Sequence, residues 1–225
     1  MSEQNLEALR NKVVSLVEES LKNDDATGWF ETIYTDAEGD LSQVPWMLSQ
    51  PHPYLQDWLQ KSPPQTAGKT ALVIGCGLGD DAEALAKLGF KVSAFDISPT
   101  AVSWCRQRFP ESEVNYFVGD LLNLDESLKQ GFDFVFECRT IQALPLKLRS
   151  QTIQAVSTLV AKQGTLLVIT RYRDSEAEPD GPPWALSEGE LSLFKQFGLQ
   201  EIHRDTFLDE NQPGVVKLRL QYQCL

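Results

Sequence analysis

The stretch Ala71-Leu-Val-Ile-Gly-Cys-Gly-Leu-Gly-Asp80-Asp-Ala-Glu-Ala-Leu-Ala-Lys-Leu-Gly-Phe90 decides the fold of this chain. Its apolar start is too short for a buried helix and predicts a strand that is buried on both faces. Glycines follow at positions 75, 77 and 79, and apolar residues then recur at helical spacing until Gly89. This is the first half of a βαβ unit. Glycine has no Cβ, so a ligand can lie against the bare backbone of the turn.

Strands and helices alternate from Lys69 onward. Further strands are predicted at 91–96, 114–118, 132–136 and 164–169, and Ser98-Pro99 begins one of the intervening helices. The last two strands, 199–207 and 215–222, are joined without a helix and should form a hairpin. We therefore expect an α/β, Rossmann-like, seven-stranded and mostly parallel sheet with one antiparallel strand, helices on both faces and an N-terminal helical extension.

The segment before the first strand does not show the alternation of strands and helices found in the rest of the chain. Residues 5–22 place apolar side chains at helical spacing, which predicts a packing helix. Residues 23–66 show no clear period over most of their length, although Pro51-His-Pro begins a further short helix. Large aromatics stand between polar residues of this segment, and they either anchor it on the core or line a pocket. These aromatics are Trp29, Phe30, Tyr34 and Trp46.

Composition narrows the class of function. The chain has 225 residues and a formal net charge of -12, which suits one acidic domain and disfavours binding to nucleic acid. No apolar run approaches the roughly 18 residues of a membrane span, and the N-terminus has no signal-peptide pattern. We therefore expect a cytoplasmic location. The scattered cysteines and the two lone histidines predict free thiols and no metal site.

Ligands of open α/β sheets bind at the carboxyl ends of the strands. The residues at the predicted strand ends are the glycine turn, Asp96, Asp120 and Glu137. Asp96 follows Gly75 by about 20 residues, and an acid at that distance typically accepts hydrogen bonds from a ribose diol. The predicted ligand therefore contains a nucleoside.

The spacing of the glycines distinguishes between nucleoside cofactors. It departs from the Gly-x-Gly-x-x-Gly pattern of dinucleotide sites, and Asp80-Asp81 at the helix N-terminus would repel a pyrophosphate. The two carboxylates favour a cationic ligand instead. S-adenosylmethionine carries an ammonium group, a sulfonium group and an adenosine ribose.

With these residues in view, the chain resembles class I S-adenosylmethionine-dependent methyltransferases. The resemblance rests on Val73–Gly79, Asp96-Ile97, Gly119-Asp120-Leu121, Phe132–Glu137 and Gly164–Val168, in the order of that family. The early stretches Gly28-Trp-Phe-Glu and Val44-Pro-Trp resemble the thiopurine-type small-molecule branch. Residues 1–66 would then be a helical and aromatic cap, and 67–225 the cofactor-binding methyltransferase domain, packed together as one unit.

The resemblance implies a set of cofactor contacts. Asp96 would hold the ribose, Ile97 and Leu121 would pack on adenine, and Asp120 would accept from its amino group. The full predicted set is Trp29, Gly75, Cys76, Gly77, Asp80, Asp96, Ile97, Asp120, Leu121 and Glu137. One position departs from the family, because Val73 stands where an acid often anchors the methionine amine. Asp80 or Asp81 is the available substitute.

The expected activity is methyl transfer to a small molecule, with a thiol or another soft nucleophile as the acceptor. The aromatic residues Tyr34, Trp46 and Trp184 are the candidate acceptor contacts. The sequence shows no obvious general base, and Glu137 is only a weak catalytic candidate. Two alternatives stay open: a non-catalytic module that binds S-adenosylmethionine, and a nicotinamide-dependent oxidoreductase. The sequence does not indicate the oligomeric state.

Overall fold

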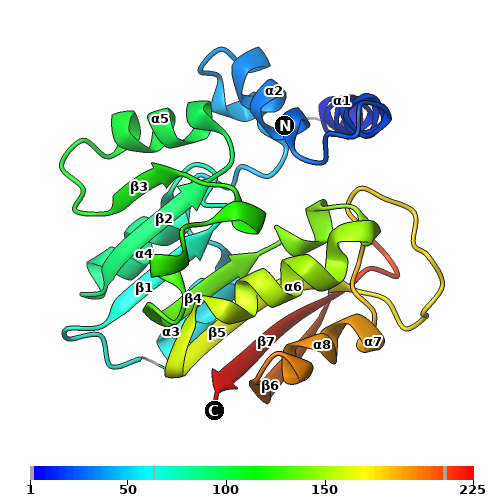
Figure 1. Ribbon diagram of the computed structural model, residues 1–225. Helices are drawn as coiled ribbons and strands as arrows, with labels where there is room; N and C mark the ends of the chain where they lie inside the picture. Colours follow the sequence, from blue (N-terminus) through cyan, green and yellow to red (C-terminus); the bar gives the residue numbers. More distant parts are fainter. Residues whose placement is uncertain (1–2, 63, 210–211) are drawn as a thin grey trace.

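The computed structural model describes residues 3–62, 64–209 and 212–225, and a seven-stranded sheet organises them (Figure 1). The strand order is β3-β2-β1-β4-β5-β7-β6, and β7 runs antiparallel to both of its neighbours. The predicted fold class is therefore confirmed. The strands are β1 (Thr70–Ile74), β2 (Lys91–Asp96), β3 (Asn115–Val118), β4 (Phe132–Cys138), β5 (Val160–Tyr172), β6 (Leu199–Leu208) and β7 (Val216–Cys224).

The central strands are buried on both faces, as their unbroken apolar runs predicted. In β1, Leu72 and Ile74 pack into one core while Ala71 and Val73 pack into the other. All four side chains are at most 2% exposed. Successive residues of a strand point to opposite faces, so a short apolar run supplies both cores at once.

Helices cover the two faces of the sheet separately (Figure 1). The first core lies under α6 (Arg149–Thr158), α7 (Glu188–Leu191) and α8 (Leu193–Gln196). The second lies under α3 (Pro53–Lys61), α4 (Asp80–Lys87) and α5 (Pro99–Arg108). The remaining short elements are 3₁₀ turns: η1 (Leu41–Gln43), η2 (Leu121–Asn123), η3 (Glu126–Leu128), η4 (Ile141–Ala143) and η5 (Leu146–Leu148).

The N-terminal cap is more helical than its sequence indicated. The helix α1 (Glu3–Lys22) was expected, but Gly28–Asp36, read above as an aromatic loop, forms a second helix, α2. Its N-cap residue Thr27 makes no side-chain capping bond, and its aromatic and β-branched residues have modest helix propensity. Burial of Trp29, Ile33 and Tyr34 supplies the stability that the local pattern does not show.

The first two helices of the cap lie beyond the carboxyl ends of the parallel strands, where Figure 1 shows α1 and α2 at the top of the molecule. Val17 of α1 packs against Trp29 and Ile33 of α2 in a small cluster of its own. Nowhere in the described residues is a helix both long and apolar enough to cross a bilayer.

A candidate cofactor site at the carboxyl ends of the strands

The glycine turn after β1 needs glycine for two different reasons. Gly75, Gly77 and Gly79 have φ angles of 59°, 53° and 88°, a region that residues with a Cβ rarely adopt. A Cβ on Gly79 would lie 2.7 Å from the Tyr116 hydroxyl, so that position also lacks space. A Cβ on Gly77 would meet nothing closer than the Tyr34 hydroxyl at 3.4 Å. The middle of the turn is therefore bare backbone next to the N-terminal cap.

Asp96 joins the glycine turn to the end of β2. Its Oδ2 accepts the Gly77 N–H at 2.9 Å, and its Oδ1 accepts the Ser98 N–H at 3.0 Å. The side chain is buried, and burial raises its pKa to about 6 although these hydrogen bonds act in the opposite direction. Each carboxylate oxygen can accept more than one hydrogen bond, so the group can still receive two ligand hydroxyls.

The next strand end carries the residues predicted to meet an adenine ring. Asp120 is exposed and its Oδ1 accepts the Leu122 N–H at 2.9 Å, which caps η2. Leu121 is buried and Ile97 is half-buried. Since β2 and β3 are paired neighbours, these residues follow adjacent strand ends, as the prediction required.

The two acids at the start of α4 have different surroundings. Arg108 binds Asp80 through two hydrogen bonds, from Nη1 to Oδ2 at 2.8 Å and from Nη2 to Oδ1 at 3.0 Å. This bidentate pair neutralises Asp80, so the arrangement does not support the predicted cofactor contact at Asp80. Asp81 forms no salt bridge with a described residue, and its Oδ1 accepts the His52 N–H at 2.6 Å. Burial raises the pKa of Asp81 to about 6.

The aromatic residues of the cap divide into anchors and partly open side chains. Tyr34 and Trp29 are 1% and 4% exposed and serve as anchors. Trp46 is half-buried and donates its Nε1–H to the Tyr34 hydroxyl at 2.8 Å. The anchoring interpretation therefore holds for Tyr34 and Trp29, whereas Trp46 keeps exposed surface that a ligand could contact.

Trp184 reaches the same cluster from the far end of the chain. It is half-buried, and it packs against the cluster of Val17, Trp29 and Ile33. Its backbone is fixed on both sides, since its N–H donates to the Gln142 carbonyl at 2.7 Å and its carbonyl accepts from Arg149 at 2.8 Å. The loop that carries Trp184 is thereby held next to the cap.

Glu31 is a residue of the site that sequence reasoning missed. It lies on α2, and its carboxylate accepts hydrogen bonds from the Ser98 hydroxyl, from the Thr100 N–H at 3.2 Å and from the Thr100 hydroxyl at 2.6 Å. Burial acts to raise its pKa, but these hydrogen bonds outweigh burial and lower it. The cap is thus attached directly beside Asp96. The only signal in the sequence was an acid within an aromatic segment.

Glu137 occupies the end of β4 as predicted, but it is completely buried. Its Oε1 accepts the Ile141 N–H at 3.0 Å, and its Oε2 has no hydrogen-bond partner among the described residues. Burial raises its pKa to about 7. In this position the carboxyl supports the turn η4 and does not reach a ligand surface. Cys76 is also buried, so only its backbone is available to a ligand.

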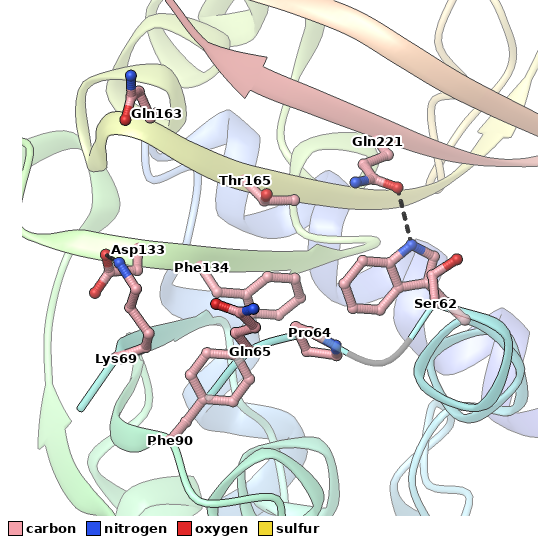
Figure 2. Close-up of a pocket in the computed structure, with 11 residues that line it drawn as sticks. Ser62, Pro64, Gln65, Lys69, Phe90, Asp133, Phe134, Gln163, Thr165 and Gln221 are labelled. Atoms are coloured by element: carbon pink, nitrogen blue, oxygen red, sulfur yellow. Dashed lines mark hydrogen bonds and ion pairs between the residues drawn. The ribbon is translucent and has the colours of Figure 1, made fainter. Parts of the chain in front are cut away.

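A separate cavity of about 280 Å³ lies at the opposite edge of the sheet (Figure 2). Lys69 and Asp133 line it at the starts of β1 and β4, and their charged groups are 2.7 Å apart. Because ligands of this fold bind at the other ends of the strands, the cavity is not part of the candidate site.

The residues at the carboxyl edge fit S-adenosylmethionine. The turn at Gly77 offers bare backbone, and Asp96 stands beside it with capacity for a ribose diol. Asp81 is a second carboxylate at this site, half-buried, and an ammonium group would stabilise its charge. The donor set matches a cationic nucleoside better than it matches a pyrophosphate, as the sequence predicted.

Comparison with known proteins gives the same result. A family model described as thiopurine S-methyltransferase matches residues 40–222. A thiopurine S-methyltransferase of Aliivibrio salmonicida is 25% identical over 187 residues, which cover 76% of this chain and 85% of that protein. One from Shewanella pealeana is 30% identical over 126 residues, which cover 55% of this chain and 56% of that protein.

Solved structures share the fold. The N-methyltransferase NodS of Bradyrhizobium japonicum, in complex with S-adenosyl-L-homocysteine, has a TM-score of 0.65 at 19% identity and covers 85% of this chain and 98% of its own. A second structure was described in work on the conversion of a disulfide bond into a thioacetal group during echinomycin biosynthesis. It has a TM-score of 0.67 at 18% identity, and the match covers 86% of this chain and 92% of that one. Because the family model covers most of the chain, this protein belongs to the thiopurine S-methyltransferase family of S-adenosylmethionine-dependent methyltransferases.

Proposed function

We propose that this methyltransferase acts on a small molecule with a soft nucleophile, and that a thiol is its best acceptor. The observation that carries the proposal is the surroundings of Gly77. Its N–H meets Asp96 at 2.9 Å, while a Cβ on Gly77 would lie 3.8 Å from the indole nitrogen of Trp46. The cofactor turn and a partly open aromatic side chain are therefore direct neighbours.

The cofactor would be held by groups at neighbouring strand ends. Asp96 would accept from the ribose hydroxyls, and Ile97 and Leu121 would pack on adenine with Asp120 near its amino group. Asp81 would bind the methionine ammonium in place of the acid that Val73 replaces. Asp81 is preferred over its neighbour because no described arginine forms a salt bridge with it, although the charge of Arg139 acts on it, whereas Arg108 pairs with Asp80. When bound, the cofactor supplies an activated methyl group on a sulfonium.

The acceptor side supports a soft nucleophile. Trp46 presents aromatic surface near the turn, and Trp184 packs on the neighbouring cluster of Val17, Trp29 and Ile33; such surface attracts both a sulfonium and polarisable sulfur. The relatives from Aliivibrio and Shewanella carry the name thiopurine S-methyltransferase. A thiol ionises near neutral pH and therefore needs no strong general base in the protein. The task of the chain is then to position the acceptor and to exclude water.

The test is a methyl-acceptor panel. The purified chain is incubated with S-adenosylmethionine and matched aromatic thiols, phenols and anilines, and S-adenosylhomocysteine is quantified over time. We expect turnover with thiols to exceed turnover with the other two classes, and we expect Asp96→Asn to abolish it. Preferred methylation of a phenol or aniline would refute the thiol assignment. Tight cofactor binding without any turnover would point to a non-catalytic module.

A further inference from the structure

Two arginines at the candidate site lack the ion-pair partners that most other arginines of this acidic chain have. Salt bridges occupy five arginines, namely Arg108, Arg149, Arg173, Arg204 and Arg219. Arg139 and Arg171 form no salt bridge with any described residue. In a chain of net charge -12, two half-buried arginines outside any salt bridge among the described residues need an explanation, although the charge of Asp81 acts on Arg139 and that of Asp209 on Arg171.

The fold brings these two arginines to the same edge of the sheet. The backbone N–H of Arg139, just after β4, donates to the Ile169 carbonyl at 3.0 Å, and Arg171 follows two residues later on β5. Arg171 is the cross-strand partner of Lys217 on β7, so their side chains share a face. By strand alternation this is the face of α3, where His52 lies.

Two N–H donors compete for the single accepting nitrogen of the neutral His52 ring. Nη2 of Arg139 lies 3.0 Å from Nε2 of His52, while Nδ1 of His52 accepts the Tyr54 N–H at 3.2 Å. Burial, together with the charge of Arg139, lowers the pKa of His52 to about 3, so the imidazole is neutral. A neutral imidazole has one accepting nitrogen, so only one of the two contacts can be a hydrogen bond. If Nδ1 keeps accepting the Tyr54 N–H that caps α3, Nε2 carries the hydrogen. The Nε2–H and the Arg139 guanidinium can then both donate to an acceptor group of a ligand.

Further positive charge surrounds the contact between Arg139 and His52. Burial lowers the pKa of Arg171, and the charges of Arg139 and of Arg10 on α1 lower it further, while the charge of Asp209 acts in the opposite direction. Lys217 adds a fourth cation, paired with Asp209 at 2.6 Å. Asp81 is the other acid whose charge acts here. The cations therefore outnumber the acids in this cluster, and the local field favours an anion.

We propose that Arg139 and Arg171 bind a carboxylate group on the methyl acceptor. The inference rests on the proposed function and adds the charge of the substrate to it. The planar guanidinium matches a carboxylate, and the cluster lies on the edge that carries the cofactor turn. The methionine carboxylate of the cofactor has the same chemistry, so the experiment must separate the two sources.

The test compares 3-mercaptobenzoate with thiophenol, which differ by the carboxylate alone. We expect Arg171→Gln to lower kcat/KM for 3-mercaptobenzoate at least about tenfold, to leave thiophenol within about twofold, and to leave the Kd of S-adenosylhomocysteine unchanged. Arg171→Lys should restore part of the loss. Arg106→Gln removes an arginine from α5, likewise outside any salt bridge, and is the matched control.

The results that overturn the inference are distinct. Equal losses with both thiols, or no loss with either, would refute an acceptor carboxylate. A weakened Kd of S-adenosylhomocysteine in Arg139→Gln and Arg171→Gln, with no change in thiol preference, would assign the cluster to the cofactor. If the wild type methylates neither thiol, binding of 3-(methylthio)benzoate against thioanisole to the S-adenosylhomocysteine complex replaces turnover. Binding that depends on Arg171 would then support the anion site while the proposed function fails.

Discussion

Acidification should weaken cofactor binding, because the carboxylates of the buried Asp96 and the half-buried Asp81 must be ionised to receive the donors of the cofactor. Burial raises the pKa of both Asp81 and Asp96 to about 6. An ammonium group and ribose hydroxyls favour the ionised forms. A ligand that binds only the ionised form loses affinity by a factor of 1 + 10^(pKa − pH), which is about 11 per group at pH 5. The two groups together predict a loss of about 100-fold between pH 8 and pH 5.

The measurement is calorimetric titration with S-adenosylhomocysteine at several pH values from 8 to 5. Circular dichroism at each pH checks that the protein stays folded. The two carboxyls themselves do not promote acid unfolding, because their folded pKa lies above the ordinary value of 3.8. The stability they contribute is fully present below that value and is lost as pH rises through about 6.

Asp81→Asn isolates one of the two groups. The amide oxygen can still accept the His52 N–H, but the charge is gone. We expect the Kd at pH 8 to rise at least about tenfold, and the further loss on going to pH 5 to shrink to about tenfold. A Kd of the folded wild type that stays constant from pH 8 to pH 5 would refute the reasoning, as would unchanged affinity of Asp81→Asn at pH 8.

Three further variants test other parts of the site. Asp80→Asn weakens the pair with Arg108 and should lower the free energy of unfolding by about 1–2 kcal/mol. It should leave the Kd of S-adenosylhomocysteine within about twofold, and a Kd change as large as that of Asp81→Asn would contradict this. Gly79→Ala should lower the free energy of unfolding by about 1–3 kcal/mol in denaturant titration, because Gly79 has a φ of 88° and a Cβ there would lie 2.7 Å from the Tyr116 hydroxyl. Unchanged stability would show that the turn can relax. Glu31→Gln should lower the free energy of unfolding by about 1–3 kcal/mol and weaken cofactor binding, because α2 loses its charged attachment beside the ribose site. A melting temperature equal to that of the wild type would show that Glu31 does not hold α2 in place.

The sequence alone determined the sheet, its glycine turn and the acid at the end of β2. These features rest on local patterns. An unbroken apolar run such as Ala71–Ile74 can be accommodated in a strand buried on both faces. The connection between the last two strands has no helix, so they must pair as a hairpin, and the positive φ of Gly75 to Gly79 calls for glycine.

Only the tertiary structure decided which polar groups are available to ligands. Asp80 and Asp81 are equivalent in the sequence, but Arg108 on the next helix neutralises one of them. Glu31 reaches the site through residues on α5, and Arg139 meets His52 from a different strand end. The availability of a charged group depends on its partners in space. Those partners are set by packing between elements far apart in the chain, and no local pattern encodes them.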